Sequence, residues 1–282
     1  MMQIGDWQVD LVSGGRFLHD GGILYGVVPK AIWQTVTPAD EQNRVPLAMN
    51  CLLARNGSHV VLIDAGHGDK LSPLDRKSHS LEPGWPLLTD LARLGVAPEE
   101  VDVVVLSHLH WDHAGGATTR INGEVTATFP SASYYVQQQE WQDANSNSLE
   151  LSGGYHENDY LPLASEGRLM LVNGSQEIVP GVRAILTGGH TRGHQAIEIS
   201  SGREGIVFLG DVAPTAAHIR RMWCTSYDLD LPQSRRVKSE LFGHAADQGH
   251  WVVWNHDRHN PISRIERHPR REFVPVEVQE NL

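Results

Sequence analysis

The sequence predicts an α/β protein in which two β-sheets form a sandwich flanked by helices. Short runs of β-favouring residues occur in both halves of the 282-residue chain, and each half also contains a clear helical pattern. Because the strands are grouped and do not alternate regularly with helices, a two-sheet sandwich fits better than a βαβα barrel. The chain has no internal repeat and no low-complexity linker, which indicates a single domain over residues 1–282.

The first half of the chain supplies a hairpin, a helix and a buried strand. Two β-rich runs, 47–55 and 59–63, flank Asn56-Gly57, a dipeptide typical of two-residue hairpin turns. Residues 86–94 carry leucines at helical spacing and stop at Gly95, which predicts a helix with a C-terminal glycine. The run 101–106 is apolar without alternation, which indicates a strand buried on both faces.

The second half is predicted to contain short strands and one long helix. Runs of β-favouring residues separated by turn residues predict strands at 133–136, 168–172, 182–186, 196–199 and 206–209. A helical pattern covers 232–248, and an apolar run at 250–254 follows it. Prolines interrupt the segment from residue 258 onward, and 273–278 has the pattern of a strand.

Composition disfavours several classes of protein. The chain has 23 Lys and Arg against 34 Asp and Glu, a net charge of −11, which disfavours nonspecific attraction to nucleic acid or an anionic membrane. No stretch approaches the roughly 20 apolar residues of a membrane helix, and the N-terminus lacks a basic and then apolar leader. Cys51 and Cys224 are far apart and are expected to be free thiols. We therefore expect a cytoplasmic protein that acts on a small molecule.

Histidine is unusually frequent, with 16 in the chain, and several lie in one cluster. His108, His110, Asp112 and His113 directly follow the predicted buried strand, whose rigid end can aim several side chains at one place. Imidazole and carboxylate are ligands that Zn²⁺ accepts, and the same loop suits Mn²⁺ or Fe²⁺. A catalytic zinc uses three protein ligands and a water, so four ligands here, with others elsewhere, indicate two metals sharing a bridging group.

Three further strand ends each carry a residue able to bind a metal. His190 lies in the loop after 182–186, Asp211 follows 206–209, and His256 follows 250–254. Each signal is weak alone, because strands often end in such turn residues. Their shared position is informative, since neighbouring strands would bring their ends to one rim.

These residues together carry a resemblance to a known family. The motif His108-Leu109-His110-Trp111-Asp112-His113, with Gly189-His190, Gly210-Asp211 and His256, resembles the metallo-β-lactamase superfamily of αββα-sandwich hydrolases. The resemblance extends over residues 47–257. It implies that one metal is held by His108, His110 and His190, that the other is held by Asp112, His113 and His256, and that Asp211 bridges them.

Three more positions match the family pattern in part. Asp64 occupies the position at which the family has a carboxylate that hydrogen-bonds a ligand histidine and so orients its ring. His194 matches a conventional position and is expected to support its loop without binding metal. Arg192 stands where that loop usually has proline, which leaves the shape of the loop open.

A shorter match points to one branch of the superfamily. Segments 20–30 and 211–215, with Met222-Trp223 and Tyr227-Asp228, resemble the quorum-quenching lactonases, which open N-acyl homoserine lactones. Well-known members place a tyrosine three residues after the bridging aspartate, where this chain has Pro214. Tyr25 and Tyr227 are the candidates to replace it, and loss of that hydrogen bond to the substrate carbonyl is the alternative.

The resemblance implies a metal-dependent hydrolase that opens the lactone ring with a hydroxide bridging two divalent metals. Zn²⁺ is the expected metal, with Mn²⁺ or Fe²⁺ as alternatives, and Asp112 and Asp211 are the catalytic carboxylates, Asp112 as a proton shuttle. An arylesterase or an organophosphate hydrolase of the methyl parathion type is the alternative. A glyoxalase II-like thioester hydrolase comes next, although that type has a basic helical C-terminal region. An inactive relative is disfavoured because all seven ligands are present.

The domain is expected to have three parts: a substrate-shaping segment (1–46), a metal-binding core (47–257) and a C-terminal tail (258–282). Trp111, inside the metal loop, is the tryptophan expected to touch a lactone or ester substrate. An apolar lining for the acyl chain is expected from Leu24, Tyr25, Val27, Val28, Ile32, Trp33, Met222 and Trp223. Related enzymes suggest a homodimer.

Overall fold

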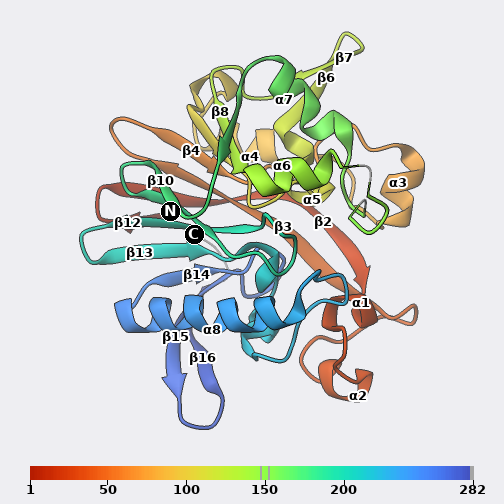
Figure 1. The fold of residues 1–282 in the computed structure, drawn as a ribbon, viewed down its shortest axis with the longest axis vertical. Coiled ribbons are helices and arrows are strands. Elements are labelled where there is room, and N and C mark those ends of the chain that lie inside the picture. Colours follow the sequence, from red (N-terminus) through yellow and green to blue (C-terminus); the bar gives the residue numbers. More distant parts are fainter. Residues whose placement is uncertain (147, 152, 280–282) are drawn as a thin grey trace.

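The computed structural model describes residues 1–146, 148–151 and 153–279, and two seven-stranded β-sheets form its centre (Figure 1). The first sheet contains, in spatial order, β1 (Met2–Ile4), β2 (Trp7–Asp20), β3 (Arg44–Arg55), β4 (Val60–Ile63), β5 (Val103–Val105), β8 (Ser133–Gln137) and β9 (Leu169–Val172). The second contains β10 (Gln176–Val179), β11 (Val182–Leu186), β12 (Gln195–Ser201), β13 (Glu204–Phe208), β14 (Trp251–Val253), β15 (Ile262–His268) and β16 (Glu272–Gln279). A separate hairpin comprises β6 (Thr118–Ile121) and β7 (Glu124–Ala127).

Helices cover the outer faces of both sheets, which confirms the predicted αββα sandwich (Figure 1). The α-helices are α1 (Gly21–Tyr25), α2 (Lys30–Trp33), α3 (Pro73–Ser78), α4 (Leu87–Arg93), α5 (Trp111–Ala114), α6 (Gln138–Ala144), α7 (Leu161–Ser165) and α8 (Leu231–Gln248). Leu91 of α4 and Leu163 of α7 pack on the first sheet, and Leu241 of α8 packs on the second. In the described part of the chain, no helix combines the length and apolar character needed to cross a bilayer.

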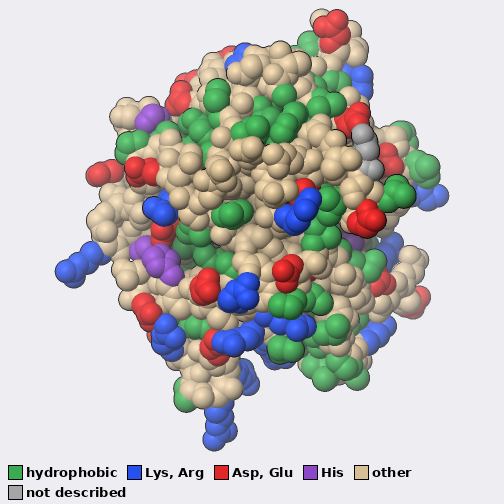
Figure 2. Space-filling view, viewed as in Figure 1, with side chains coloured by type: hydrophobic (Ala, Val, Ile, Leu, Met, Phe, Trp, Pro, Cys, Tyr) green, Lys and Arg blue, Asp and Glu red, His purple; other side chains and the backbone are tan. Residues whose placement is uncertain are grey.

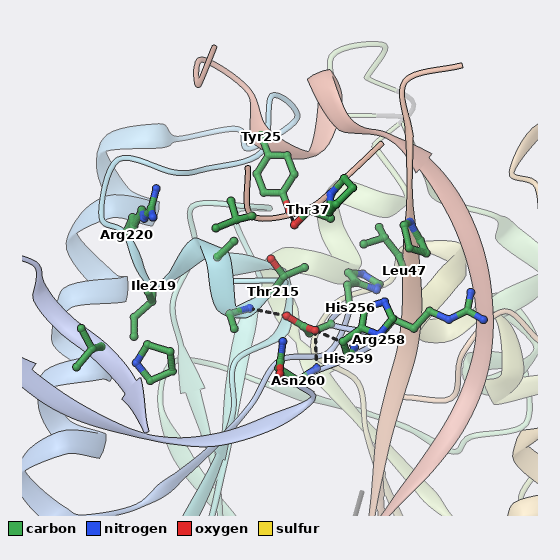
Figure 3. Close-up of a pocket in the computed structure, with 18 of the residues that line it drawn as sticks. Tyr25, Thr37, Leu47, Thr215, Ile219, Arg220, His256, Arg258, His259 and Asn260 are labelled. Atoms are coloured by element: carbon green, nitrogen blue, oxygen red, sulfur yellow. Dashed lines mark hydrogen bonds between the residues drawn. The ribbon is translucent and has the colours of Figure 1, made fainter. Parts of the chain in front are cut away.

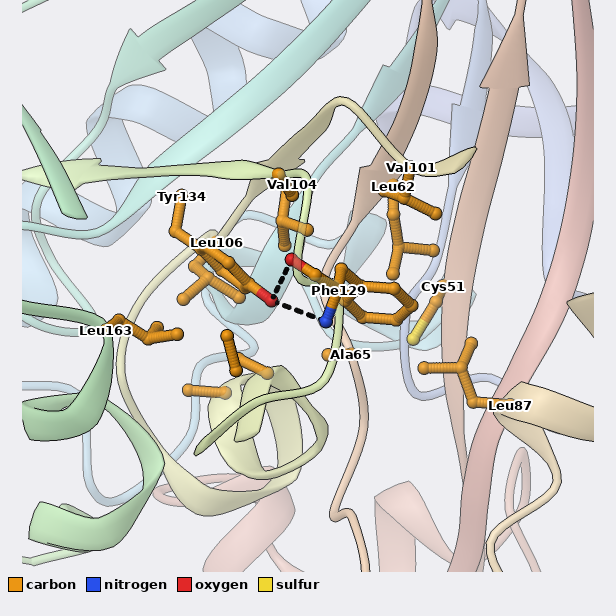
Figure 4. Close-up of a cluster of buried hydrophobic side chains, with 14 of the residues drawn as sticks. Cys51, Leu62, Ala65, Leu87, Val101, Val104, Leu106, Phe129, Tyr134 and Leu163 are labelled. Carbon is orange, nitrogen blue, oxygen red and sulfur yellow. Dashed lines mark hydrogen bonds between the residues drawn. The ribbon is translucent and has the colours of Figure 1, made fainter. Parts of the chain in front are cut away.

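The main core lies between the two sheets and a second apolar layer lies under the helices. Val103 and Val105 of β5 face the second sheet, whereas Val104 faces the helices (Figure 4). This alternation explains the unbroken valine run and confirms the strand predicted to be buried on both faces. In the helix-covered layer the hydroxyl of Tyr134 accepts a hydrogen bond from the backbone N–H of Phe129 at 2.9 Å, so this buried polar group is satisfied.

Most of the N-terminal segment 1–46, which is expected to shape the substrate site, belongs to the first sheet. β1 and the 14-residue β2 form one side of that sheet. Ser13-Gly14-Gly15 resembles a turn, but the pairing with β3 only shifts register there. A Cβ on Gly14 would lie 2.6 Å from the Cα of Gly66, so this glycine allows two backbone segments to touch.

Two smaller differences concern a turn and the C-terminal region. Arg55 pairs with Val60, so the hairpin predicted as a two-residue turn at Asn56-Gly57 has a four-residue loop. Residues from 258 onward, expected as a tail, form β15 and β16 at the edge of the second sheet. Pro275 is accommodated because β16 is an edge strand, and the strand predicted at 273–278 is confirmed.

Candidate metal centre

The loops that follow several strands meet at one rim of the sandwich. The chain leaves β5 through residues 107–113, which include α5, and leaves β13 through the 3₁₀ turn Gly210–Val212. The loop between β11 and β12 carries His190, and the residues after β14 carry His256. The structure brings all seven residues predicted as metal ligands into this one cluster.

Three histidines form one half of the cluster. Nε2 of His108 lies 2.9 Å from Nδ1 of His110, and Nε2 of His190 lies 3.2 Å from the same nitrogen. The two histidines of the loop after β5 thus meet a residue about 80 positions further along the chain. Three ring nitrogens that converge in this way can hold one metal ion.

The other half consists of Asp112, His113 and His256. Oδ2 of Asp112 lies 3.5 Å from Nε2 of His256, and its Oδ1 lies 3.8 Å from Nε2 of His113. This group also presents three donors close enough to hold one ion.

Asp211 lies between the two halves and faces both of them. Its Oδ1 lies 3.2 Å from Nε2 of His113 and 3.0 Å from Nε2 of His256. Its Oδ2 lies 3.5 Å from Nε2 of His190. Because each carboxylate oxygen points to a different half, the side chain has the geometry of a bridging ligand.

Burial and neighbouring charges shift the pKa values of the cluster in both directions. Burial opposes protonation of His113, His190 and His256, but the charge of Asp211 outweighs it and raises their pKa values. Burial, and then the nearby His190, lowers the pKa of His110 to about 3, so its ring is neutral. Burial alone would raise the pKa of Asp211, but the charges of His256 and His113 hold it well below its usual value. Neutral imidazole and ionised carboxylate are the forms that coordinate a cation.

The residues present fit a pair of divalent cations. Their donors are imidazole nitrogens and carboxylate oxygens, the set that zinc and related metals prefer. Nε2 of His113 is buried and has no hydrogen-bonding partner among the described residues, although it lies between two carboxylates. An unpaired ring nitrogen at the centre of such a cluster is suited to coordinating a cation.

A second layer of hydrogen bonds orients the histidine rings. The structure places Oδ2 of Asp64 2.7 Å from Nδ1 of His113, as the resemblance implies. Nδ1 of His256 lies 2.6 Å from the carbonyl oxygen of Ala48. Each contact fixes the tautomer that leaves Nε2 free to face the cluster.

Two supporting carboxylates were not predicted from the sequence. Oδ1 of Asp228 lies 3.1 Å from Nδ1 of His190, and the hydroxyl of Thr225 donates to the same oxygen. Glu140 of α6 is buried and accepts hydrogen bonds from the backbone of Leu109 and the hydroxyl of Thr191, so it joins the two ligand loops. No local pattern around Glu140 marks it, because the two ligand-loop residues that it binds are distant in sequence.

Contacts with α6 and with the turn at Asp211 hold the loop between β11 and β12, in which Arg192 takes the place of the usual proline. Nε of Arg192 donates to Asp143 at 2.8 Å, which fastens the loop to α6. Gly193 is required here, since a Cβ would lie 2.2 Å from the backbone nitrogen of Glu140. His194 supports the loop, as expected, because its Nε2 accepts the backbone N–H of Asp211.

A cavity of about 540 Å³ opens onto the cluster. His110, Asp112, His190 and Asp211 reach its wall. Trp111 of the same ligand loop and residues from four other parts of the chain complete the lining, among them Phe17, His19, His79, Leu151, Tyr155, Tyr227 and Leu229. Trp111 lies in this cavity, where the sequence analysis expects it to meet substrate.

Of the two candidate tyrosines, the structure brings only Tyr227 to the cavity. The ring of Tyr227 packs edge-on against His190, with 5.4 Å between the ring centroids. Burial, and then the charges of Asp211 and Asp112, raises its pKa well above the usual value, so the hydroxyl stays protonated. The loop carrying it is anchored by Lys238 of α8, whose ammonium donates to backbone carbonyls of His218, Arg220 and Trp223.

The expectation for Tyr25 is not met. Its ring is fully buried and stacked between Trp33 and His218. Its hydroxyl lies 2.5 Å from that of Thr37 and borders a separate cavity of about 520 Å³ on the other side of His256 (Figure 3). The hydrogen bond to Thr37 and the aromatic stacking hold Tyr25 in the core.

The expected acyl-chain lining is likewise wrong for the cavity at the cluster. None of those eight residues is among the residues that line it. Leu24, Tyr25, Trp33 and Trp223 form a buried cluster, whereas Val27, Ile32 and Met222 are exposed. The helices α1 and α2 each bury one face and expose the other. Residue type alone does not tell which of their apolar side chains lie on the buried face.

The comparisons with known proteins agree with this geometry. A profile of the metallo-beta-lactamase superfamily matches residues 44–271. This chain therefore belongs to the metallo-β-lactamase superfamily. An N-acyl homoserine lactonase from Bacillus cereus is 29% identical over 187 residues, which are 62% of this chain. The match spans 66% of that relative, just under two thirds of its length.

Two solved structures extend the comparison over nearly the whole chain. The crystal structure of a probable metal-dependent hydrolase from Staphylococcus aureus has a TM-score of 0.89 at 30% identity, covering 99% of this chain and 100% of that one. AidC, described as a dizinc quorum-quenching lactonase in complex with a product, has a TM-score of 0.79 at 19% identity, covering 98% and 95%. The second similarity is evidence for the fold alone.

Proposed function

We propose that this protein is a dinuclear metal-dependent lactonase that opens the ring of N-acyl homoserine lactones, a quorum-quenching activity. The observation that carries the proposal is Asp211, which faces two three-ligand groups beside a cavity large enough for a small acylated ring. The similarity to the Bacillus cereus lactonase supports the choice of substrate class.

In this proposal the seven ligands divide as the family pattern implies. One metal is held by His108, His110 and His190, and the other by Asp112, His113 and His256, with Asp211 shared. Zn²⁺ is the proposed metal, because imidazole and carboxylate in three-ligand groups suit it. When bound, such a pair polarises the carbonyl and supplies a nucleophile from water near neutral pH.

The chain's own groups then position the substrate and move a proton. The protonated hydroxyl of Tyr227 donates a hydrogen bond to the lactone carbonyl oxygen, where negative charge develops during attack. Asp112 reaches the cavity wall and takes the proton that must pass to the departing ring oxygen. Because that oxygen stays tethered in the product, no second small molecule has to leave first.

The cavity supports an apolar acyl group as part of the substrate. Phe17, Trp111, Leu151 and Leu229 contribute apolar lining from different segments. The C-terminal region consists of strands β15 and β16, unlike the basic helical region expected of a glyoxalase II-like enzyme. This difference favours the lactone over a glutathione thioester.

The experiment is a metal analysis of purified protein together with a pH-stat assay. The substrates are homoserine lactones with short and long acyl chains, a phenyl ester, an organophosphate triester and a glutathione thioester. About two metals per chain and the highest kcat/KM on lactones would support the proposal. Preference for the ester, triester or thioester would move the function to that class, and protein without metal after zinc-replete purification would refute it.

One substitution tests the metal assignment directly. His110→Ala removes a donor from the three-histidine group, so we expect loss of about one metal per chain and of nearly all hydrolysis. His59→Gln, in the loop between β3 and β4, is the matched control and should behave as the wild type. Full metal content and full activity of His110→Ala, with an unchanged circular dichroism spectrum, would contradict the assignment.

A further inference from the structure

A second cluster of metal-binding side chains lies outside the metal centre, on the outer face of the second sheet. It consists of Glu198 of β12, His244 of α8 and His250, which lies just before β14. Oε1 of Glu198 lies 2.5 Å from Nε2 of His244 and 3.1 Å from Nδ1 of His250. The three candidate ligand atoms all lie within 4.8 Å of one another.

The spacing of these donors matches that in the metal centre. There, adjacent ring nitrogens of His108, His110 and His190 lie 2.9 and 3.2 Å apart. Donors bound to a tetrahedral zinc at about 2.0–2.1 Å are roughly 3.3 Å apart, so both clusters need only a small opening to admit an ion. Two imidazoles and one carboxylate are also a common ligand set for a divalent transition metal.

The fold holds two of the three side chains in place. α8 ends at Gln248 and is capped by Gly249, whose φ of 67° lies in the left-handed region. The backbone N–H of His250 then donates to the carbonyl of Ala245 at 2.9 Å. The ring of His250 packs on Gly205, where a Cβ would lie 2.4 Å from the ring. Glu198 has a side chain only 12% exposed, because α8 covers this part of β12.

The third side chain leaves an approach from solvent. The side chain of His244 is 44% exposed, so an ion can enter beside it and keep water in its remaining coordination position. In Figure 2, histidine side chains reach the surface beside the C-terminal end of α8. Most of the Lys and Arg side chains in this part of the view lie lower, over α8 and the β15–β16 hairpin. The rings of His244 and His250 are nearly perpendicular, at 89°, with centroids 5.4 Å apart.

We propose that Glu198, His244 and His250 form a binding site for one divalent transition-metal ion, with Zn²⁺ as the expected occupant. The ion would join the end of α8 and the entry of β14 to β12. These elements flank the metal centre, since β12 follows the loop of His190 and β14 leads into His256. An ion that binds only the folded chain also stabilises it.

The first experiment counts zinc in the holoenzyme. Wild type, His244→Gln and the control His59→Gln are equilibrated with zinc, desalted and analysed for metal content. The glutamine at position 244 keeps an amide that can donate to Glu198, and the side chain at this position is partly exposed, so the variant should fold. We expect wild type and control to carry about one zinc more than His244→Gln, with equal activity in all three.

The measured quantity is the difference in zinc content per chain between wild type and His244→Gln. Both proteins have the same metal centre, so the number of ions held there cancels in this difference. Equal zinc content in wild type and His244→Gln would overturn the inference. So would a midpoint of thermal unfolding that zinc raises equally in both proteins.

A second measurement identifies the ligands without using activity. One equivalent of Cu²⁺ is added to the zinc-loaded protein, where its higher affinity for nitrogen and oxygen ligands lets it replace Zn²⁺ at the partly exposed site, and the electron paramagnetic resonance spectrum is recorded. We expect hyperfine structure from two imidazole nitrogens in wild type and from one in His244→Gln, and Glu198→Gln should weaken Cu²⁺ binding. A copper spectrum that none of these substitutions changes would also overturn the inference.

Discussion

The carboxylate of Asp64 and the imidazole of His113 are joined by a 2.7 Å contact that is fully buried and links the end of β4 to the loop after β5. Asp64 has a φ of 57°, a left-handed conformation that is unusual for a residue other than glycine. Its oxygens also accept hydrogen bonds from the backbone and hydroxyl of Ser107. This arrangement turns Nε2 of His113 toward Asp211, so a strained residue outside the ligand set orients a ligand.

Replacing Asp64 tests this orienting contact. Asp64→Asn removes the charge that faces Nδ1 of His113, so we expect the zinc affinity of one half of the centre to fall by roughly 10- to 100-fold. Zinc competition with a chelator measures this, and release should become clearly biphasic. Asp247→Asn, which changes an exposed pair with Arg267, is the control and should leave release unchanged. Identical release curves for Asp64→Asn and wild type would show that the contact has no role in metal binding.

Asp211 is predicted to act on both metals at once. Asp211→Asn removes the shared carboxylate, so both ions should bind more weakly, by more than the roughly 10- to 100-fold typical of orienting partners. The matched comparison is Asp228→Asn, which changes only the partner of His190 and should weaken a single ion. Zinc titration of both variants decides between the two patterns, and loss of just one ion in Asp211→Asn would contradict the bridge.

The two tyrosines are predicted to differ in their effect on catalysis. Tyr227→Phe removes the hydroxyl proposed to face the carbonyl oxygen, and we expect kcat on lactones to fall by roughly 100- to 1,000-fold with little change in metal content. Tyr25→Phe removes a hydroxyl that pairs with Thr37 away from the cavity, so kcat should stay near wild type. Steady-state kinetics of both variants give the answer, and the opposite ranking would restore Tyr25 as the carbonyl partner.

Stability against acid should depend on His218. Burial, and then the charge of Lys238, lowers its pKa to about 3, and its ring nitrogens contact Thr215 and the carbonyl of Leu24. In the unfolded chain this histidine has a pKa of about 6.5, so below that pH it binds a proton that it does not bind in the folded protein. The free energy of unfolding is therefore highest above pH 6.5 and falls as the pH is lowered toward 3. This group alone contributes a slope of about 1.4 kcal/mol per pH unit within that window.

His218→Gln should remove that slope. We expect the variant to be less stable at pH 7 but to lose less free energy of unfolding between pH 6.5 and 5 than the wild type. Urea unfolding at fixed zinc concentration measures both, and any effect of metal release is common to the two proteins. Equal pH slopes would mean that His218 is not neutral in the folded state.

The positions predicted as metal ligands could be recognised in the sequence because each lies a few residues after a strand. The valines of β5 indicate a buried strand, and His108, His110, Asp112 and His113 lie within the eight residues that follow it. A short rigid loop limits where such side chains can point, so local spacing carries most of the information. The second ligand loop, after β11, follows the same logic.

The pocket could not be read in this way, because its wall is assembled from segments far apart in the chain. Tyr25 and Tyr227 are equal candidates by residue type, yet stacking against Trp33 and His218 buries one and leaves the other at the metal centre. The same holds for Glu140, whose partners lie in two loops distant from α6.

The sequence by itself determined the fold class and the family, since these depend on apolar periodicity and on short motifs near the ends of strands, and the same motifs predicted the seven ligands. The tertiary structure alone decided that β2 belongs to the first sheet, that Asp228 and Glu140 support the ligand loops, and which tyrosine meets the cavity. The physical reason is that side-chain burial and long-range hydrogen bonds depend on how whole layers pack, and no local pattern encodes that packing.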